Sequence, residues 1–312
     1  MARIYNCIDA GSEYCPCNLA DSLDCISCSH LRGEDLCDCN WNGVCILYEY
    51  YMQNKQFKDF RKSYVGFLVD KTILEENLFL LKIQLNKELL KELNEIGSYI
   101  FIKSSESNHY FYTPMSIFNV DEDYAYVVYQ QIGPKTKPIQ QGEKLTIKGP
   151  YWNGIIGESK ITNVKNSVIL IIARGIGQSS ILIPIKKLAE KNNKITLVLD
   201  KGKLKSLYCL DYVPNKNIKV EILDLFSVTG EDELSQIIKN NASDIIFSAG
   251  AEMLHRKVSS IINETENNAK FFVTNNNILC CGEGICGSCI RKTNSGERIR
   301  TCKTRINPKN MY

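Results

Sequence analysis

The sequence predicts a multidomain α/β fold with a β-barrel: a small antiparallel barrel comes first, a doubly wound parallel sheet follows, and a cysteine-rich segment lies at each end. Three observations lead to this expectation. About six short runs rich in β-branched and aromatic residues lie between residues 64 and 157. From residue 167 onward, strand-like runs alternate with helical stretches, as in a parallel sheet. Of the 14 cysteines, all except Cys209 lie before residue 46 or after residue 279.

Length and charge limit the possible functions. With 312 residues, the chain is long enough for two or three domains. Its 38 Lys and Arg residues nearly balance its 35 Asp and Glu residues, so no overall positive field indicates a nucleic-acid partner. The N-terminal stretch has no apolar segment of the signal-peptide kind, and no apolar run approaches the length of a bilayer span. We therefore expect a soluble, cytoplasmic protein without a membrane partner.

Residues 1–50 are predicted to form a metal-binding head. The segment is loop-rich and too short for a substantial apolar core, so an inorganic group is expected to hold it together. Reduced cytosolic thiols favour metal ligation over disulfides. The C-x-C and C-x2-C pairs place two sulfurs on one side of a tight turn, which suits tetrahedral coordination. Zinc and iron–sulfur both stay open, and the candidate ligands are Cys7, Cys15, Cys17, Cys25, Cys28, Cys37, Cys39 and Cys45.

Residues 60–157 are predicted to form the barrel, preceded by a helical stretch at 47–63. Clusters of Asn, Gly, Ser and Asp separate most of the short strands, which favours antiparallel pairing. The region 86–97 has a helical pattern. Strands are expected at 65–74, 77–86, 98–104, 109–120, 123–132 and 143–149.

Residues 165–275 are predicted to form the α/β domain. The turn after its first strand carries Gly175 and Gly177 and leads into a helix. Backbone N–H groups and the helix dipole favour a phosphate at such a position. Strands are expected at 167–173, 194–200, 218–225, 243–250 and 270–274, and helices at 179–193, 231–240 and 251–264.

Residues 276–312 carry the most specific motif. Its spacing, C-x4-C-x2-C-x12-C, is set by Cys281, Cys286, Cys289 and Cys302 and matches plant-type [2Fe–2S] proteins. Glycines within it permit the sharp turns that wrap a compact cluster. A zinc site also takes four thiolates, but zinc ribbons usually show two separated C-x2-C pairs. We therefore expect a [2Fe–2S] cluster, with Cys280 as a spare thiol.

The order of these parts resembles the electron transfer subunit of dihydroorotate dehydrogenase and its relatives, the small subunits of sulfide dehydrogenase and ferredoxin–NADP oxidoreductase. These proteins belong to the ferredoxin–NADP reductase superfamily, and the resemblance runs from Tyr64 to the end of the chain. It implies that the barrel binds FAD, that the Rossmann-like domain binds NAD(P), and that the cluster passes electrons to a partner subunit. The cysteine-rich head is an addition to this architecture.

The resemblance also assigns cofactor-binding residues, several of them in altered motifs. Relatives carry Arg-Pro-x-Ser where this chain has Thr113, Pro114, Met115 and Ser116, and a neutral Thr cannot neutralise a phosphate. Lys135 offers a local positive charge instead. Whether NAD(P)H still binds stays open, because the nicotinamide motifs keep their glycines and lose other residues. The further candidates are Gly133, Lys135, Thr136, Gly149, Asn153, Gly154, Gly175 and Gly177.

Two functions are consistent with these features. The first is an oxidoreductase subunit that relays electrons between FAD or NAD(P)H and a partner, either a catalytic oxidoreductase subunit or a ferredoxin-type protein. No catalytic residue is assigned, since only three histidines are available as general bases. The alternative is a non-catalytic metal-binding adaptor that keeps the reductase fold but binds no nucleotide. Because the turn at Gly175 and Gly177 is altered, we expect NADH to reduce the flavin slowly or not at all.

Overall fold

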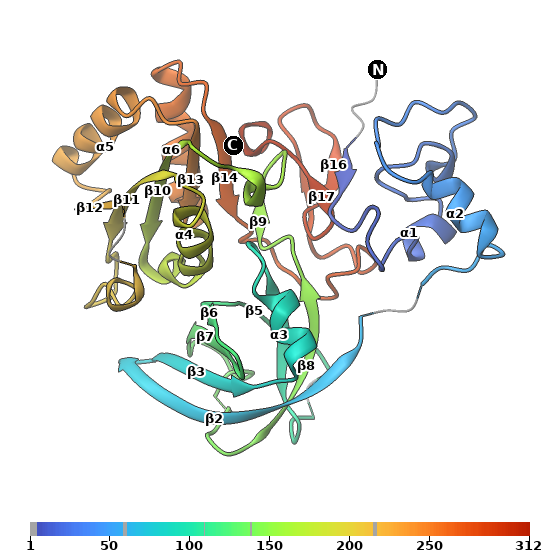
Figure 1. Ribbon diagram of the computed structural model, residues 1–312, viewed down its shortest axis with the longest axis horizontal. Coiled ribbons are helices and arrows are strands. Elements are labelled where there is room, and N and C mark those ends of the chain that lie inside the picture. Colours follow the sequence, from blue (N-terminus) through green and yellow to red (C-terminus); the bar gives the residue numbers. More distant parts are fainter. Residues whose placement is uncertain (1–4, 59–60, 109, 138, 215–216) are drawn as a thin grey trace.

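Among the described residues, the molecule has two large β-sheets, a cysteine-rich head and a C-terminal segment, and two further sheets have only two strands each (Figure 1). The computed structural model describes residues 5–58, 61–108, 110–137, 139–214 and 217–312. In this view the antiparallel sheet lies below the parallel sheet, and the head lies to one side, next to the C-terminal segment. Within the described residues, no helix combines the length and the apolar character needed to span a bilayer.

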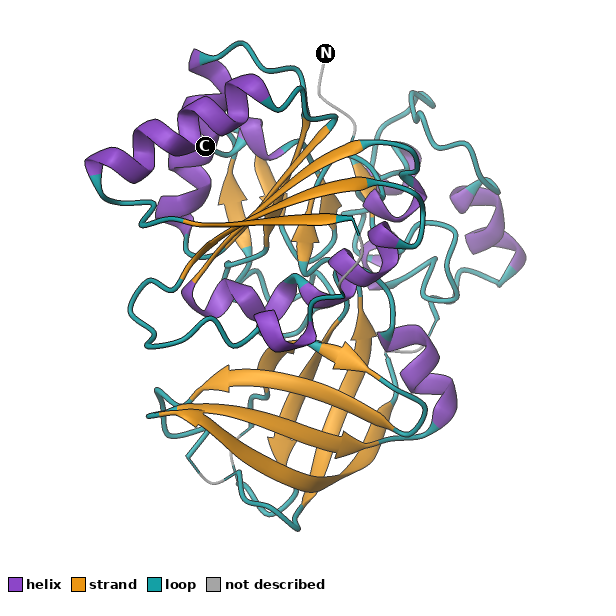
Figure 2. Cartoon of the chain, turned by 60° about the vertical axis from the view of Figure 1, so that its left-hand side comes forward, coloured by secondary structure: helices purple, strands orange, loops and turns teal. Residues whose placement is uncertain are grey.

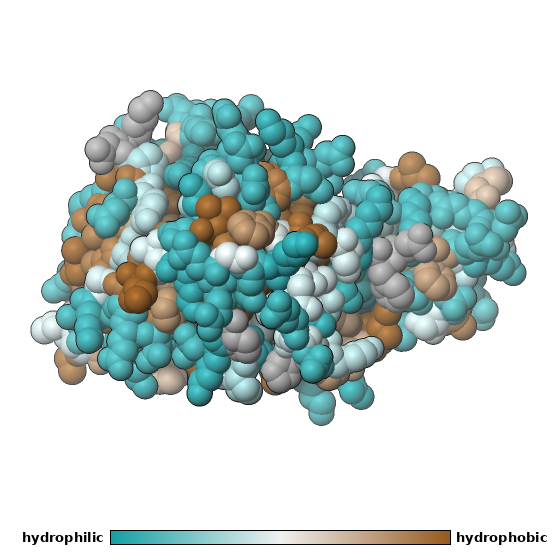
Figure 3. All heavy atoms as spheres, turned by 90° about the horizontal axis from the view of Figure 1, so that it is seen from below, coloured by the Kyte–Doolittle hydropathy of each residue, from teal (hydrophilic) through white to brown (hydrophobic). Residues whose placement is uncertain are grey.

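The antiparallel sheet contains the strands that were predicted for the barrel. Among the described residues its order is β5-β4-β8-β2-β3-β7-β6, and the sheet curves round its core (Figure 2). Leu81, Ile83 and Ile147 are fully buried in that core, while the outer face shows apolar patches among hydrophilic atoms (Figure 3). The elements are β2 (Ser63–Glu75), β3 (Leu78–Gln84), α3 (Lys87–Leu93), β4 (Tyr99–Ser104), β5 (Thr113–Ser116), β6 (Asn119–Val120), β7 (Tyr124–Gln130) and β8 (Lys144–Tyr151).

One predicted strand divides into two. The run at 109–120 becomes β5 and β6, which lie at opposite ends of the sheet order, and its first residue, His109, lies outside the described residues. Asn86 begins α3 as predicted, because its side chain accepts a hydrogen bond from the backbone N–H of Leu89 at 2.8 Å.

The parallel sheet has the order β12-β11-β10-β13-β14-β9 among the described residues, and only β9 runs antiparallel to its neighbour. Alternate residues of β10 face opposite layers. Ile169 and Ile171 share a core with α4, and Leu170 and Ile172 share one with α5 and α6. The elements are β9 (Ile155–Ile156), η2 (Ile161–Asn163), β10 (Val168–Arg174), η3 (Gly175–Ser180), α4 (Leu182–Ala189), β11 (Lys194–Asp200), η4 (Leu210–Tyr212), β12 (Ile218–Ile222), α5 (Val228–Asn240), β13 (Ile245–Ala249), α6 (Glu252–Glu264) and β14 (Lys270–Thr274).

Two helices differ from their predicted extent. The predicted helix at 179–193 is shorter, because a 3-10 turn, η3, precedes α4 and residues 190–193 leave the helix. The helical stretch predicted at 47–63 ends at Met52. Asn54 and Lys55 have φ angles of +54° and +59°, a left-handed conformation that a helix cannot continue through.

The head joins the C-terminal segment through a strand pair. Residues Asn6–Cys7 form β1, which pairs antiparallel with β17 (Thr304–Arg305). No sequence pattern indicated this pairing of the two ends of the chain. The remaining elements of these two parts are α1 (Asn18–Asp21), η1 (His30–Arg32), α2 (Ile46–Met52), β15 (Ile290–Lys292), β16 (Arg298–Arg300) and η5 (Pro308–Asn310).

The barrel and the α/β domain share one continuous core. Phe118, which follows β5, is buried and packs edge-on against Tyr212, with ring centroids 5.1 Å apart. Tyr208 lies on the other side at 6.1 Å. Lys186 of α4 donates a hydrogen bond to the Asn119 side chain at 2.9 Å. The two sheets are therefore held close together at this junction.

Candidate functional site

Three glycines shape the C-terminal cysteine loop. Gly282, Gly284 and Gly287 have φ angles of +71°, +78° and +72°, which L side chains rarely adopt. A Cβ on Gly282 would also lie 2.4 Å from the ring of Tyr151. The loop therefore requires glycine for its turns and for its close approach to the end of β8.

Hydrogen bonds surround the thiols of this loop. Cys289 and Cys302 are both buried, with their Sγ atoms 3.2 Å apart, and the Cys302 hydrogen bond lowers the pKa of Cys289 to about 6. The backbone N–H of Glu283 donates to Sγ of Cys281 at 3.3 Å. Cys286 is exposed, and its thiol donates to Ser288 Oγ at 3.4 Å. The four thiols therefore differ: the pKa values of Cys286 and Cys289 are lowered, burial raises the pKa of Cys281, and the hydrogen bond with Cys289 together with burial raises that of Cys302 well above its ordinary value. Thiolates are the form that binds metal.

This donor set fits an iron–sulfur or zinc centre. A tetrahedral metal with a metal–sulfur distance of about 2.3 Å places its sulfurs roughly 3.8 Å apart. The Sγ atoms of Cys289 and Cys302 are nearer to each other than this, at 3.2 Å, and would have to move apart on binding. Among the described side chains, no three cysteine, histidine or carboxylate groups are already gathered as ligands of one metal ion. Binding would therefore require the thiols of Cys281 and Cys286 to turn inward, and all four ligand roles stay predictions.

An aromatic wall separates the cysteine loop from the barrel. Tyr151 stacks on Tyr99 at 5.2 Å and meets Phe101 edge-on at 5.1 Å. Its hydroxyl donates to the backbone oxygen of Cys281 at 3.3 Å. Tyr151 therefore lies between the barrel and the cysteine loop.

The predicted flavin strand is β5, at the edge of the antiparallel sheet. Thr113 and Ser116 are partly exposed, as is Pro114, and Met115 points into the core. The preceding residue, Tyr112, packs on the aromatic wall. The Nζ atoms of Lys103 and Lys148 lie 5.1 and 4.7 Å from its ring centroid. These two lysines provide positive charge beside the position where relatives carry Arg, and the sequence gave no direct indication of them.

The residues of the predicted phosphate loop contact residues that are near them in the sequence. The Thr136 hydroxyl donates to the backbone oxygen of Gly133 at 3.1 Å. The ammonium of Lys135 lies 5.5 Å from the centroid of the Phe111 ring and is exposed. Cofactor roles for these residues stay predictions.

The Gly-Pro motif begins within β8, and its residues 149–154 pack against other parts of the chain. Asn153 is buried, and its side-chain amide donates to the backbone oxygens of Thr301 and Thr304, the latter at 3.2 Å. A Cβ on Gly154 would lie 2.6 Å from the backbone oxygen of Gly97. A Cβ on Gly149 would meet Ile100 at 3.0 Å. Packing alone therefore explains why these positions carry Gly149, Asn153 and Gly154. The side-chain amide of Asn153 is already hydrogen-bonded to the C-terminal segment.

The predicted nicotinamide turn is η3. Gly175 has a φ of +57°, and a Cβ on Gly177 would lie 2.2 Å from the backbone oxygen of Ala249. The Nε of Arg174 donates to the Asp200 carboxylate at 2.7 Å. An acidic residue at the end of the second strand of such a sheet is the group that binds ribose hydroxyls. The Asp200 carboxylate, which is the group expected to bind a ribose, is therefore already paired with Arg174.

The barrel and α/β motifs meet at one crevice. Ser116 of β5, Gly154 and Ser180 of η3 line it together, and its volume is about 10 Å³. The fold thus brings together three parts that the sequence assigned to flavin and nicotinamide binding, although the space between them is too small for a nucleotide.

A buried charge network links the head to the cysteine loop. Arg61 donates to Asp9 at 2.6 Å and to Glu283 at 2.9 Å. Lys303 is fully buried and pairs with the same two carboxylates. Two cations and two anions thus balance. Lys303 is therefore paired inside the protein.

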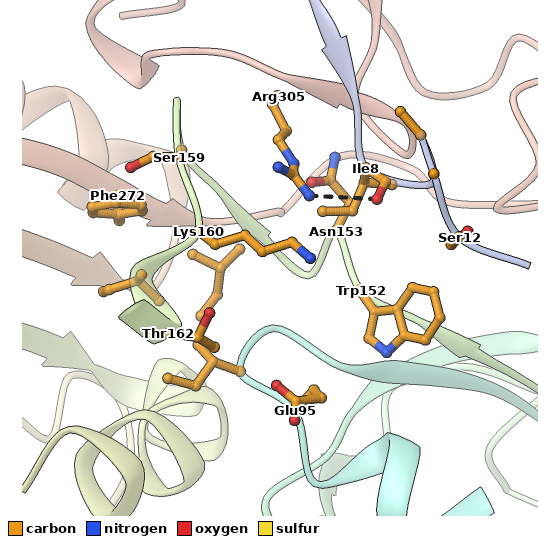
Figure 4. A pocket seen from close by; sticks show the side chains of 16 residues that line it. Ile8, Ser12, Glu95, Trp152, Asn153, Ser159, Lys160, Thr162, Phe272 and Arg305 are labelled. Atoms are coloured by element: carbon orange, nitrogen blue, oxygen red, sulfur yellow. Dashed lines mark hydrogen bonds between the residues drawn. The ribbon is translucent and has the colours of Figure 1, made fainter. Parts of the chain in front are cut away.

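A larger cavity of about 310 Å³ lies where the head, the barrel and the α/β domain meet (Figure 4). Trp152, Lys160 and Arg305 line it, and Arg305 donates to the backbone oxygen of Ile8 at 3.4 Å. Of the predicted cofactor-binding residues, only Asn153 reaches it. This cavity is therefore distinct from the predicted flavin and nicotinamide sites.

Comparison with known proteins agrees with this fold. No protein-family model matches the chain. The solved structure of an NADH-dependent reduced ferredoxin–NADP oxidoreductase superposes with a TM-score of 0.61 at 20% identity, over 78% of this chain and 86% of that one. A Plasmodium falciparum ferredoxin–NADP+ reductase superposes with a TM-score of 0.50 at 17% identity, over 68% and 96% of the two chains. The architecture is that of a ferredoxin–NADP reductase.

The curated proteins that are similar in sequence are electron transfer subunits. The dihydroorotate dehydrogenase B electron transfer subunit of Clostridium perfringens is 26% identical over 66% of this chain and 82% of its own length. A homolog of that subunit from Aquifex aeolicus is 21% identical over 75% of this chain and 92% of its own length. The chain is similar to these electron transfer subunits, and the resemblance seen in the sequence is confirmed.

Proposed function

We propose that the chain is the electron transfer subunit of an oxidoreductase and that it relays electrons between FAD and a partner through a C-terminal [2Fe–2S] cluster. One observation carries the proposal. The loop of Cys281, Cys286 and Cys289 packs against an aromatic wall of the barrel, and Tyr112, next to the flavin strand β5, belongs to the same wall. The names of the curated relatives support the same role.

Different residues of this chain would bind the flavin and the cluster. The edge of β5 would hold the flavin, with Lys103 and Lys148 offsetting the charge of its pyrophosphate. Bound flavin supplies the conversion between two-electron and one-electron chemistry. The four cysteines would hold the cluster, and the aromatic wall excludes water between them and β5.

The partner would approach on the exposed side of the cysteine loop. Cys286 is exposed there, and Ile278 and Ile285 nearby are 77% and 51% exposed. Exposed apolar side chains of this kind are typical of docking surfaces. By analogy with the relatives, the partner is a catalytic oxidoreductase subunit.

The second candidate is a metal-binding adaptor that has lost its nucleotides. Two observations favour the adaptor. The Arg174–Asp200 ion pair takes up the carboxylate that a nucleotide ribose would need, and the crevice of about 10 Å³ is too small for a nicotinamide nucleotide. The two candidates differ in whether the isolated chain retains a flavin.

Anaerobic purification of the full chain separates them. We expect flavin absorption bands together with those of a [2Fe–2S] cluster, and we expect the cluster bands to disappear in Cys289→Ser. Cys209→Ser is the matched control, because Cys209 is a buried thiol remote from the motif in sequence. A colourless protein that contains only zinc would contradict the relay and support the adaptor.

A further inference from the structure

The eight cysteines of the head fall into different surroundings. Four of them line a single cavity of about 20 Å³ between α1 and the loops around it. In contrast, Cys37 and Cys45 are exposed, and Cys37 and Cys39 have Sγ atoms 3.8 Å apart outside this cavity. The four that line the cavity are Cys7, Cys15, Cys17 and Cys25.

Backbone amides are directed at each of these four sulfurs. Cys7 receives a hydrogen bond from the backbone of Asp9, and Cys15 from Gly11. The other two receive them from residues that follow two or three positions later: Leu19 for Cys17, and both Ser27 and Cys28 for Cys25. Outer hydrogen bonds of this kind orient thiolate ligands and stabilise their charge. Burial outweighs them, and the pKa of each of the four thiols lies above its ordinary value.

Charged side chains lie at and near the cavity. Asp9 lines it and pairs with the buried Lys303. Lys303 favours the ionised forms of Cys7 and Cys17, whereas Asp9 disfavours them. Arg305, on β17 beside β1, lies outside the lining of this cavity and interacts with the charge of Cys7. Its Nε is buried and has no hydrogen-bond partner among the described residues.

We propose that Cys7, Cys15, Cys17 and Cys25 bind one thiophilic divalent ion, Zn²⁺ or Fe²⁺, in a tetrahedral site. A cavity of about 20 Å³ has room for one ion but not for a multi-iron cluster. Four thiolates and one divalent ion leave a net negative charge. Asp9 and Glu283 already balance Lys303, so Arg305 offsets part of this charge through its interaction with Cys7. Since the thiols are not gathered among the described residues, each loses its proton and turns toward the ion on binding.

The ion has a structural consequence. Cys7 lies on β1, which pairs with β17 two residues after Cys302. A metal that holds Cys7 to Cys15, Cys17 and Cys25 therefore fixes the whole head on the C-terminal cysteine loop. This inference stands whether or not the C-terminal loop holds a [2Fe–2S] cluster, because it uses a separate set of thiols.

Metal analysis of the full chain after anaerobic purification tests the site. We expect Cys17→Ser to contain one ion fewer per chain than the wild type, while Cys45→Ser and Cys209→Ser keep that ion. Retention of the ion in Cys17→Ser would overturn the proposal. Equal losses in Cys17→Ser and Cys45→Ser would also overturn it, since they would indicate one larger site that uses thiols outside the cavity.

A Co²⁺ titration supplies the second arm and covers the case in which Cys17→Ser does not fold. It is done in a Cys302→Ser background, which disables the C-terminal cluster site. We expect a strong thiolate-to-cobalt band that is altered in Cys25→His, a variant that can still bind the ion, and unchanged in Cys209→Ser. An unaltered band in Cys25→His would exclude Cys25 as a ligand. Absence of the cluster absorption from the wild-type chain, together with an intact cobalt band in the Cys302→Ser background, would contradict the proposed function only.

Discussion

At the scale of single residues, Arg174 changes what the nucleotide fold can bind. Asp200 accepts hydrogen bonds from Arg174 at 2.7 Å, from the backbone of Gly202 at 2.6 Å and from Leu225 at 3.1 Å. Its carboxylate is therefore already satisfied by protein groups. A ribose would have to displace the Arg174 guanidinium, which also lies 4.5 Å from the centroid of the Phe226 ring.

Substitution of Arg174 should reopen this position. We expect Arg174→Ala to strengthen NADH binding roughly fivefold, because an ion pair of this partly exposed kind is worth about 1 kcal/mol. Isothermal titration with NADH measures the change. Lys219→Ala is the control, since it removes a surface ion pair with Glu221 on β12 of the same sheet. Unchanged NADH binding in Arg174→Ala would show that the pair does not limit access.

His255 makes the stability of the α/β domain depend on pH. It is buried, its Nδ1 lies 2.9 Å from the Ser248 hydroxyl, and Asn276 lies 2.9 Å from its Nε2. Burial lowers its pKa to about 4, so the unfolded chain takes up the proton first. The stabilisation is complete above about pH 6.5 and is lost as the pH falls toward about 4.

Urea unfolding at several pH values measures this effect. We expect the wild type to lose about 2 kcal/mol of unfolding free energy between pH 7.5 and pH 5 through His255. His255→Gln should lose correspondingly less over the same interval, whatever its absolute stability. Equal pH slopes for the two proteins would contradict a neutral His255 in the folded state.

At the scale of elements, strands β4 and β8 supply the positively charged side chains near β5. Ile102 of β4 pairs with Thr113, and Lys148 of β8 pairs with Phe101. This register places Lys103 and Lys148 on either side of Tyr112. The charge that the altered motif lacks in sequence is therefore restored by residues from other strands.

Removal of these lysines should weaken flavin binding. A charge-assisted hydrogen bond contributes about 1.5–3 kcal/mol, so each of Lys103→Ala and Lys148→Ala is expected to weaken FAD affinity about ten- to a hundredfold. Fluorescence titration of the apoprotein with FAD gives the values. Lys82→Ala is the control, because Lys82 makes a similar contact with Tyr124 at 4.1 Å elsewhere in the sheet. Equal affinities for all three variants would place the pyrophosphate somewhere else.

Local patterns in the sequence predicted the elements well, and long-range contacts were beyond them. Alternation and turn residues located α3, α5, α6 and most strands of both sheets to within a few residues, but they missed β9 and merged β5 with β6. No sequence pattern indicated the charge network of Asp9, Arg61, Glu283 and Lys303, because residues so far apart in the chain become partners only after folding. For the same reason, the β1–β17 pairing and the hydrogen bonds of Asn153 could not be predicted. The domain boundaries and the ligand roles stay predictions.

At the scale of the whole molecule, the buried charge network holds three parts together. Asp9 belongs to the head, Arg61 precedes the barrel, and Glu283 and Lys303 belong to the C-terminal segment. Arg61 also lies 4.1 Å from the Tyr14 ring and 4.5 Å from the Tyr151 ring. Loss of any member leaves a buried charge without compensation.

Asp9→Asn tests this coupling. Arg61 and Lys303 would then face Glu283 alone, and we expect a loss of about 3–5 kcal/mol of unfolding free energy. Glu49→Gln, which removes a partly exposed ion pair with Lys58 in the head, should cost less than about 1 kcal/mol. Urea unfolding midpoints compare the two variants. Similar small losses in both would mean that the network does not hold the head in place.

Electron paramagnetic resonance of the anaerobically reduced full chain tests the relay most directly. The account predicts the signal of a reduced [2Fe–2S] cluster in the wild type and in Cys280→Ser, with loss of that signal in Cys302→Ser. Absence of the signal from a wild-type protein that contains only zinc would contradict electron transfer through the C-terminal loop. Retention of the signal in Cys302→Ser would exclude Cys302 as the fourth ligand.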